Sequence, residues 1–212
     1  MPFGFPNITP ATLAARLIVL LVVMPIHEWA HAWSAYQLGD DTASLQGRLT
    51  LNPVAHLDLF GGILILMTGF GWAKPVPVNP YRMQRVSARA GMALSSLAGP
   101  ASNFLTAMLC AIPFRLGLLS LSGGSGGLFD PATLLLYVAQ VSVGLGLFNL
   151  LPFYPLDGEK VLVGILPREW GDRLLSIRPY SPYILMGLMV LGVAGLLVGL
   201  LWGPLMTLLF WV

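Results

Sequence analysis

Long apolar runs, separated by shorter polar segments, dominate the pattern of hydrophobic and polar positions along this chain of 212 residues. The runs cover about residues 9–36, 88–119, 130–151 and 181–212. Because a helix rises about 1.5 Å per residue, each run is long enough to cross a hydrocarbon core about 30 Å thick. The pattern therefore predicts about four transmembrane helices, the last of them a single tilted helix.

The first apolar run begins and ends with signals that are typical of a helix. Thr9 can cap the helix, Pro10 occupies its first position, and Gly39 follows its end. Pro25 lies inside the run, where it either frees a backbone carbonyl and bends the helix or is an ordinary transmembrane proline. Both interpretations keep the run as one spanning helix.

The segment between the first two runs has a different pattern. Apolar and polar residues alternate over residues 45–51, which predicts a short strand, and residues 76–78 indicate a second extended piece. The apolar stretch 59–70 between them is too short to cross the membrane. We therefore expect a re-entrant or β-hairpin segment here.

Composition and charge place the chain in a membrane. Hydrophobic residues make up 56% of the chain and charged residues 9%, whereas a soluble domain has about 25% charged residues. Basic residues gather in segments 48–89 and 160–178, and the positive-inside rule puts both on the cytoplasmic side and both termini outside. The net charge of +2 is too small to indicate nucleic-acid binding.

The expected fold class is thus an all-α polytopic membrane protein with the re-entrant or hairpin segment on the cytoplasmic side. No linker, low-complexity tract or internal repeat divides the sequence, so residues 1–212 are expected to form one domain. The N-terminal segment lacks the basic residues that begin a signal peptide. The expected location is the cell membrane, with the first run retained as a span.

Two histidines and a glutamate lie inside the first apolar run. His27 and His31 are four residues apart, so both imidazoles lie on one helix face and can bind one Zn²⁺. Glu28 between them can act as a base on a water molecule at the metal. The pattern indicates a metallopeptidase, and its alternative is a polar helix turn that faces a water-filled cavity.

A catalytic zinc usually has three protein ligands, so the sequence should supply one more. It is either His56, the only other histidine, or a carboxylate. Asp157 is the best carboxylate because it follows a proline-broken apolar stretch, where an unpaired charge would be costly in lipid. Alternatively, Asp157 only caps a short helix expected over residues 157–166.

Four motifs follow one another along the chain: HEWAH at residues 27–31, NPVAHLD at 52–58, AGPASN at 98–103, and an asparagine at 149 followed by PFYPLDG at 152–158. Together they resemble the site-2 protease family of intramembrane zinc metalloproteases, over about residues 15–165. The sequence is most similar to the minimal bacterial and archaeal members, which lack a PDZ or CBS domain.

The resemblance implies a role for each matching residue. His27, His31 and Asp157 carry over as the ligands of one zinc ion per chain, and Glu28 carries over as the general base. It also implies that two further residues lie near the scissile carbonyl, where they could hold the developing oxyanion: His56 and Asn149. Without the resemblance, these two are a loop histidine that faces water and an asparagine that bonds between helices.

The activity implied is hydrolysis of a peptide bond within or next to a transmembrane segment. The substrate would be a membrane-anchored protein, such as an anti-sigma factor or another precursor of a transcription regulator. A zinc transporter or channel would need more polar residues along a route through the spans than this chain offers. A silent scaffold that binds partner helices would have no need of Glu28 as a base.

Overall fold

A computed structural model describes residues 10–69, 71–121 and 130–210. Every regular element in these ranges is a helix, and none of the described residues forms a strand. Within these described ranges, four helical segments are long and apolar enough to cross a membrane: Thr12–Gln37, Ala88–Arg115, Pro131–Asn149 and Val193–Phe210. The predicted all-α membrane protein with four spans is therefore confirmed.

The first span is one continuous helical segment that changes its winding in the middle. It consists of α1 (Pro10–Ile18), a π-helical turn (Val19–Val23) and α2 (Met24–Gln37). The π turn ends two residues before Pro25, whose ring supplies no N–H to the preceding turn. The helix is therefore widened just before this proline, and α2 continues beyond it through His27 and His31.

Short helices occupy the segment between the first two spans. They are α3 (Thr42–Leu45), α4 (Pro53–His56) and α5 (Leu59–Thr68). The strand predicted for residues 45–51 is wrong, because α3 ends there and Gly47 turns the chain with a φ of 66°. Its backbone conformation is one that favours glycine and breaks an extended strand. The re-entrant placement of α5 stays a prediction.

The second and third spans are α6 (Ala88–Arg115) and α7 (Pro131–Asn149). Asp130 caps α7 by accepting a hydrogen bond from the amide of Thr133 at 2.8 Å. Small residues let α6, α7 and the last span pack closely. The buried cluster they share contains Ala107, Cys110, Ala111, Ala139, Val143, Leu147, Val198 and Phe210.

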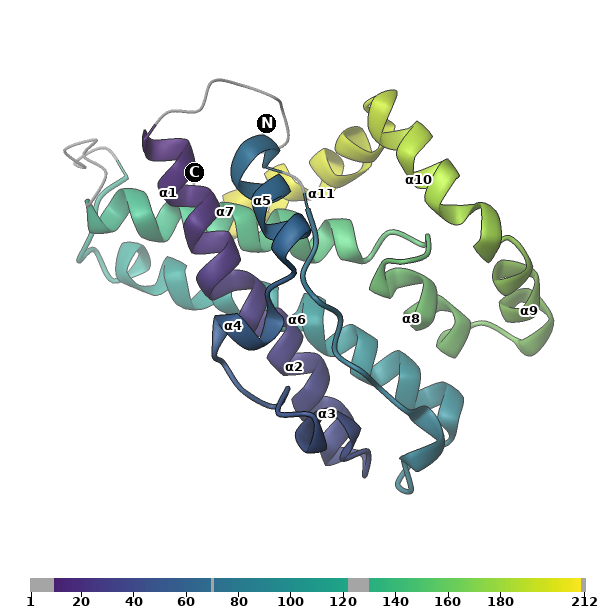
Figure 1. Ribbon diagram of the computed structural model, residues 1–212. Coiled ribbons are helices and arrows are strands. Elements are labelled where there is room, and N and C mark those ends of the chain that lie inside the picture. The colour runs from purple at the N-terminus through teal and green to yellow at the C-terminus, as the bar shows by residue number, and fades with distance from the viewer. Residues whose placement is uncertain (1–9, 70, 122–129, 211–212) are drawn as a thin grey trace.

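The last apolar run is not the single tilted helix that the sequence predicts. It forms α10 (Ser181–Val190) and α11 (Val193–Phe210), and Gly192 between them has a φ of 73°. This left-handed glycine ends α10, and Figure 1 shows the chain turning sharply before α11. Before α10 come α8 (Asp157–Ile165) and α9 (Arg168–Ser176).

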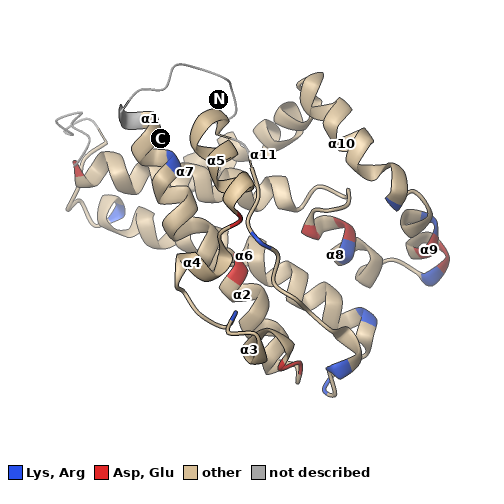
Figure 2. Cartoon of the chain, viewed as in Figure 1, with Lys and Arg blue, Asp and Glu red and all other residues tan. Residues whose placement is uncertain are grey.

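The basic residues gather at one end of the bundle. Figure 2 shows them where α6 begins and along α8 and α9, at the lower right of the view, with fewer at the opposite end. The glycine-rich stretch of the sequence at residues 122–127, between the second and third spans, lies outside the described residues. The cytoplasmic position of the basic end, and the placement of both termini outside, remain predictions.

Candidate metal centre

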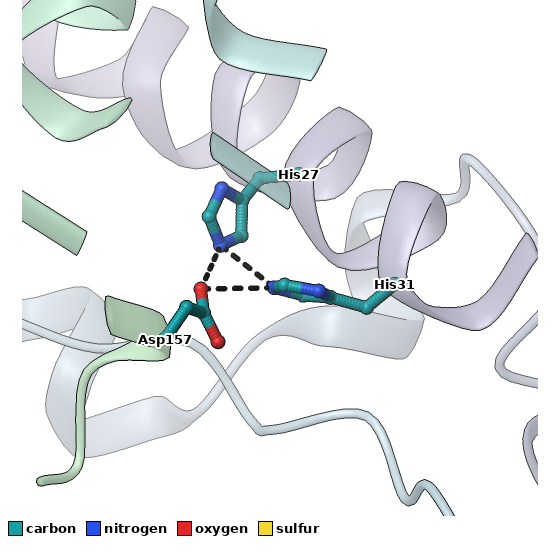
Figure 3. A group of neighbouring side chains, drawn as sticks. All are labelled: His27, His31 and Asp157. Carbon is teal, nitrogen blue, oxygen red and sulfur yellow. Dashed lines mark hydrogen bonds and ion pairs between the residues drawn. The ribbon is translucent and has the colours of Figure 1, made fainter. Parts of the chain in front are cut away.

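Two histidines from α2 and an aspartate from α8 meet in the interior of the protein (Figure 3). His27 Nε2 lies 3.0 Å from His31 Nε2, and these atoms lie 3.2 and 3.1 Å from Asp157 Oδ2. All three residues are buried. Among the described residues, these three form the one group of histidine, cysteine, aspartate or glutamate side chains that could hold a metal ion.

The donor atoms of this group fit a zinc ion. Bonds of about 2.0–2.1 Å in a tetrahedral site place neighbouring ligand atoms about 3.3 Å apart, close to the separations found between these side chains. Two imidazole nitrogens and a carboxylate oxygen are a suitable donor set for Zn²⁺ and leave a fourth position for water. A shared cation also explains why three hydrogen-bond acceptors converge in a buried place.

Glycines let the surrounding helices approach the triad. A Cβ atom at Gly99 of α6 would lie 2.3 Å from His31 Nε2 and 2.7 Å from His27 Cε1, so a larger residue would displace both rings. A Cβ atom at Gly158 would lie 2.2 Å from the carbonyl oxygen of Leu150. The glycine after Asp157 therefore allows α8 to start directly against the end of α7.

Outer hydrogen bonds orient both imidazole rings. His31 Nδ1 lies 2.7 Å from the carbonyl oxygen of Ser95, which can only accept, so Nδ1 carries the proton and Nε2 offers its lone pair to the triad. His27 Nδ1 lies 3.0 Å from the side-chain amide of Asn103, which is fully buried.

One of the two orientations of the Asn103 amide gives His27 the same arrangement as His31, with the proton on Nδ1 and the lone pair on Nε2. In one orientation the amide nitrogen faces His27, and Oδ1 is buried without a hydrogen-bond partner among the described residues. With the amide turned over, Oδ1 accepts the Nδ1 proton of His27, which leaves the Nε2 lone pair of that ring free for a metal. Asn103 lies in a motif that the sequence singles out, but its partner 76 residues away could be found only from the packing of α6 on α2.

The two carboxylate oxygens of Asp157 have different partners. Oδ2 faces the imidazoles, while Oδ1 lies 3.4 Å from Nζ of Lys160, one turn further along α8. Burial by itself would raise the pKa of Asp157, but in the metal-free protein the charges of protonated His31 and His27, and the hydrogen bonds that these rings then donate, outweigh burial and hold the pKa well below its usual range. The carboxylate is therefore ionised, as a metal ligand must be.

Comparison with known proteins assigns the family. The chain is 41% identical over 186 residues to the Bacillus subtilis strain 168 protein named "Putative zinc metalloprotease YwhC", and the match covers 85% of this chain and 83% of that protein. The chain belongs to the site-2 protease family of zinc metalloproteases. The zinc cofactor predicted from the sequence is confirmed by this kinship and by the metal-binding group.

Two mycobacterial members of the family are more distant. The Mycobacterium tuberculosis strain H37Rv protein named "Putative zinc metalloprotease Rip2" is 29% identical over 209 residues, which cover 95% of this chain and 74% of Rip2. Rip3 of the same strain is 29% identical over 211 residues, which cover 94% of this chain and 45% of Rip3. No family model and no solved structure matches the chain.

Glu28 lies on α2 beside the triad and is held by the segment of residues 74–79, which has no regular secondary structure. Its Oε2 accepts a hydrogen bond from the amide of Val76 at 3.1 Å. The segment is fixed by three more hydrogen bonds: Lys74 N to His56 O (2.8 Å), Arg48 Nη2 to Lys74 O (2.5 Å) and Asn79 N to Asp40 Oδ2 (2.6 Å). Residues 76–78 form no regular element and pair with no strand in the described chain, so the second extended piece stays a prediction.

The remaining two predicted site residues make other contacts. His56 is 1% exposed and its Nε2 lies 2.7 Å from the carbonyl oxygen of Thr50. Asn149 donates to the carbonyl oxygen of Leu145 in its own helix at 3.0 Å. Within the described chain, neither side chain hydrogen-bonds to the triad. Their proximity to a scissile carbonyl stays a prediction.

We expect replacement of Asn103 by leucine to weaken zinc binding by about 10–100-fold, because the Nδ1 proton of His27 loses its acceptor and the ring is no longer oriented. Leucine has a similar volume, so the packing of α6 on α2 should persist. A matched control is Thr106→Ala, which removes a hydroxyl that bonds only within α6. Competition with a chromophoric chelator measures the affinity, and equal affinities of the two variants would refute the orienting role of Asn103.

Proposed function

We propose that this protein is an intramembrane zinc metalloprotease that hydrolyses a peptide bond within or next to a transmembrane segment of a membrane-anchored protein. The observation that carries the proposal is the buried His27–His31–Asp157 group beside Glu28, whose two histidines lie on a helical segment long enough to span the membrane. The names of its relatives support the same activity. The site is expected to open toward the cytoplasmic side.

Glu28 is the proposed general base. Zinc, when bound, lowers the pKa of a coordinated water toward about 7. Glu28 takes a proton from the attacking water and can return it to the leaving amine. The amide of Val76 holds one oxygen of this carboxylate, which aims the carboxylate and limits the rotamers it can adopt.

His56 and Asn149 are the proposed donors to the oxyanion. Because the Nε2 proton of His56 goes to Thr50, its buried Nδ1 can donate only when the ring is protonated. Asn149 can donate from its second amide hydrogen while keeping its bond to Leu145. Both roles require that the scissile carbonyl of the substrate comes within hydrogen-bond distance of His56 and Asn149.

Replacing either His56 or Asn149 with alanine should lower kcat by roughly 10²–10³-fold, because a lost oxyanion donor acts on the transition state. Zinc occupancy should remain at the wild-type level, since neither residue bonds to the triad. Single-turnover cleavage and metal analysis of the same preparations measure both quantities. Unchanged kcat in both variants would leave these residues with structural roles only.

The proposed function is tested by coexpression with a panel of single-span proteins tagged at both ends. Wild-type protein should split at least one of them into two tagged fragments, whereas the Glu28→Gln form should split none. Cleavage inside or beside the span is read from fragment masses. A wild-type protein that carries zinc but cleaves no member, and that instead moves zinc across vesicles, would favour a transporter.

A further inference from the structure

The helix that carries Asp157 is held at both of its ends by arginines from other parts of the chain. Helix α8 has nine residues, starts with Asp157 and lies outside the four candidate spans. A helix this short is marginal by itself and depends on its neighbours for its position. Whatever fixes α8 therefore also fixes the third candidate metal ligand.

Arg178 holds the first turn of α8. Its Nε and Nη2 donate to the two carboxylate oxygens of Glu159 at 2.8 and 2.9 Å, a bidentate pair across 19 residues of sequence. Glu159 is 1% exposed and stands two residues after Asp157. The guanidinium also lies over the ring of Tyr154, 4.8 Å from its centre, so the pair joins α8 to the turn that precedes it.

Arg89 holds the other end of α8. From the first turn of α6, its Nε donates to the carbonyl oxygen of Val163 and its Nη2 donates to that of Leu166 at 2.5 Å. These carbonyls belong to the last turn of α8 and to its C-cap, where a cation is favourable. The helices touch here, since a Cβ atom at Gly164 would lie 2.2 Å from Cβ of Ala93.

We propose that Arg178 and Arg89 are positioning residues that clamp α8 from its two ends and thereby set the Asp157 carboxylate at the metal site, with Arg178 acting through Glu159. The inference rests on the proposed function, since it takes Asp157 as a zinc ligand. Neither arginine touches the triad in the described chain, so each acts through α8.

The burial of Glu159 favours positioning over simple stabilisation. Taking the carboxylate of Glu159 out of water is costly, although the Arg178 side chain keeps 43% of its surface exposed, and apolar residues often stabilise a fold as well as such a desolvated charge pair does. A bidentate pair differs from apolar packing in being directional, because both oxygens must face the planar guanidinium. It therefore fixes the rotation of α8 about its axis, on which the direction of Asp157 depends.

The test compares zinc affinity with the stability of the metal-free protein. In Arg178→Gln we expect the dissociation constant for zinc to rise at least tenfold, and in Arg178→Lys we expect it to rise less.

The double variant Glu159→Leu/Arg178→Leu removes both charges. It should unfold at or above the wild-type temperature without metal and still bind zinc at least tenfold more weakly. Arg89→Lys, which can make one of the two carbonyl bonds, should also weaken zinc binding.

A matched control is Arg173→Gln, which removes a basic residue of α9 that lies over Trp170, and it should bind zinc like the wild type. Wild-type zinc affinity in the double variant would contradict the positioning role. Failure of that variant to fold would also contradict it, because the ion pair would then only stabilise the fold. If the wild type itself binds no zinc, the proposed function fails instead. If Asp157→Ala loses zinc but the Arg178, Glu159 and Arg89 variants bind zinc normally, only this inference is wrong and the proposed function stands.

Discussion

Replacing Glu28 with glutamine will reduce peptide hydrolysis by about 10²–10⁴-fold, the range that a general base contributes, and will leave zinc bound. Glutamine keeps the shape of the side chain and can still accept the amide hydrogen of Val76 through its carbonyl oxygen. It cannot take a proton from water at neutral pH. The variant therefore removes the group that transfers the proton and leaves the neighbouring metal ligands, His27 and His31, in place.

The measurement is zinc content and cleavage rate on the same purified sample. Glu169→Gln is a matched control because it makes the same change on an exposed position of α9, and it should leave both quantities unchanged. Turnover by the Glu28 variant at the wild-type rate would eliminate the proposed chemistry. Loss of zinc from it would mean that Glu28 supports the metal site instead.

Replacing Asp157 with alanine will remove both zinc and activity. The change leaves two imidazoles as ligands, so we expect zinc affinity to fall by more than the roughly 10–100-fold that is typical of residues outside the ligand set. Activity should fall with occupancy, since the described residues offer no other metal-binding group. Lys160 would also lose the carboxylate it faces at 3.4 Å.

The control for this variant is Asp58→Ala. Asp58 caps α5 by accepting from the amide of Gly61 at 2.8 Å, so its loss should cost about 1 kcal/mol of stability but no zinc. If zinc survives the loss of Asp157 and disappears in His56→Ala, the third ligand has been assigned to the wrong residue. Metal analysis after dialysis distinguishes these results.

The elements that the sequence predicts well are those governed by local rules. The four-residue spacing of His27 and His31 guarantees a shared helix face, and α7 begins at Pro131, where the third apolar run of the sequence begins. Asp157 could be chosen because a charge beside lipid needs a partner. The structure brings it to the two histidines, within 3.2 Å.

The elements that the sequence does not predict depend on contacts between distant residues or on single backbone angles. Alternation over residues 45–51 resembles a strand, but Arg48 is buried and donates to the carbonyl of Lys74, which holds this stretch as a loop. The break at Gly192 leaves no trace in hydropathy, since glycine is common inside membrane helices. Asn103 contacts His27 only because α6 packs on α2, and the sequence does not show this packing.

The most direct test of the account is a zinc titration of the metal-free protein in liposomes that contain a tagged single-span substrate. Cleavage should be absent without metal, rise in proportion to added zinc, and saturate at one zinc per chain. The Glu28→Gln form should bind the same amount of zinc and cleave at a small fraction of the wild-type rate. Cleavage by the metal-free protein, or equal rates for the two forms at saturating zinc, would contradict the assignment of a zinc protease centred on His27, His31 and Asp157.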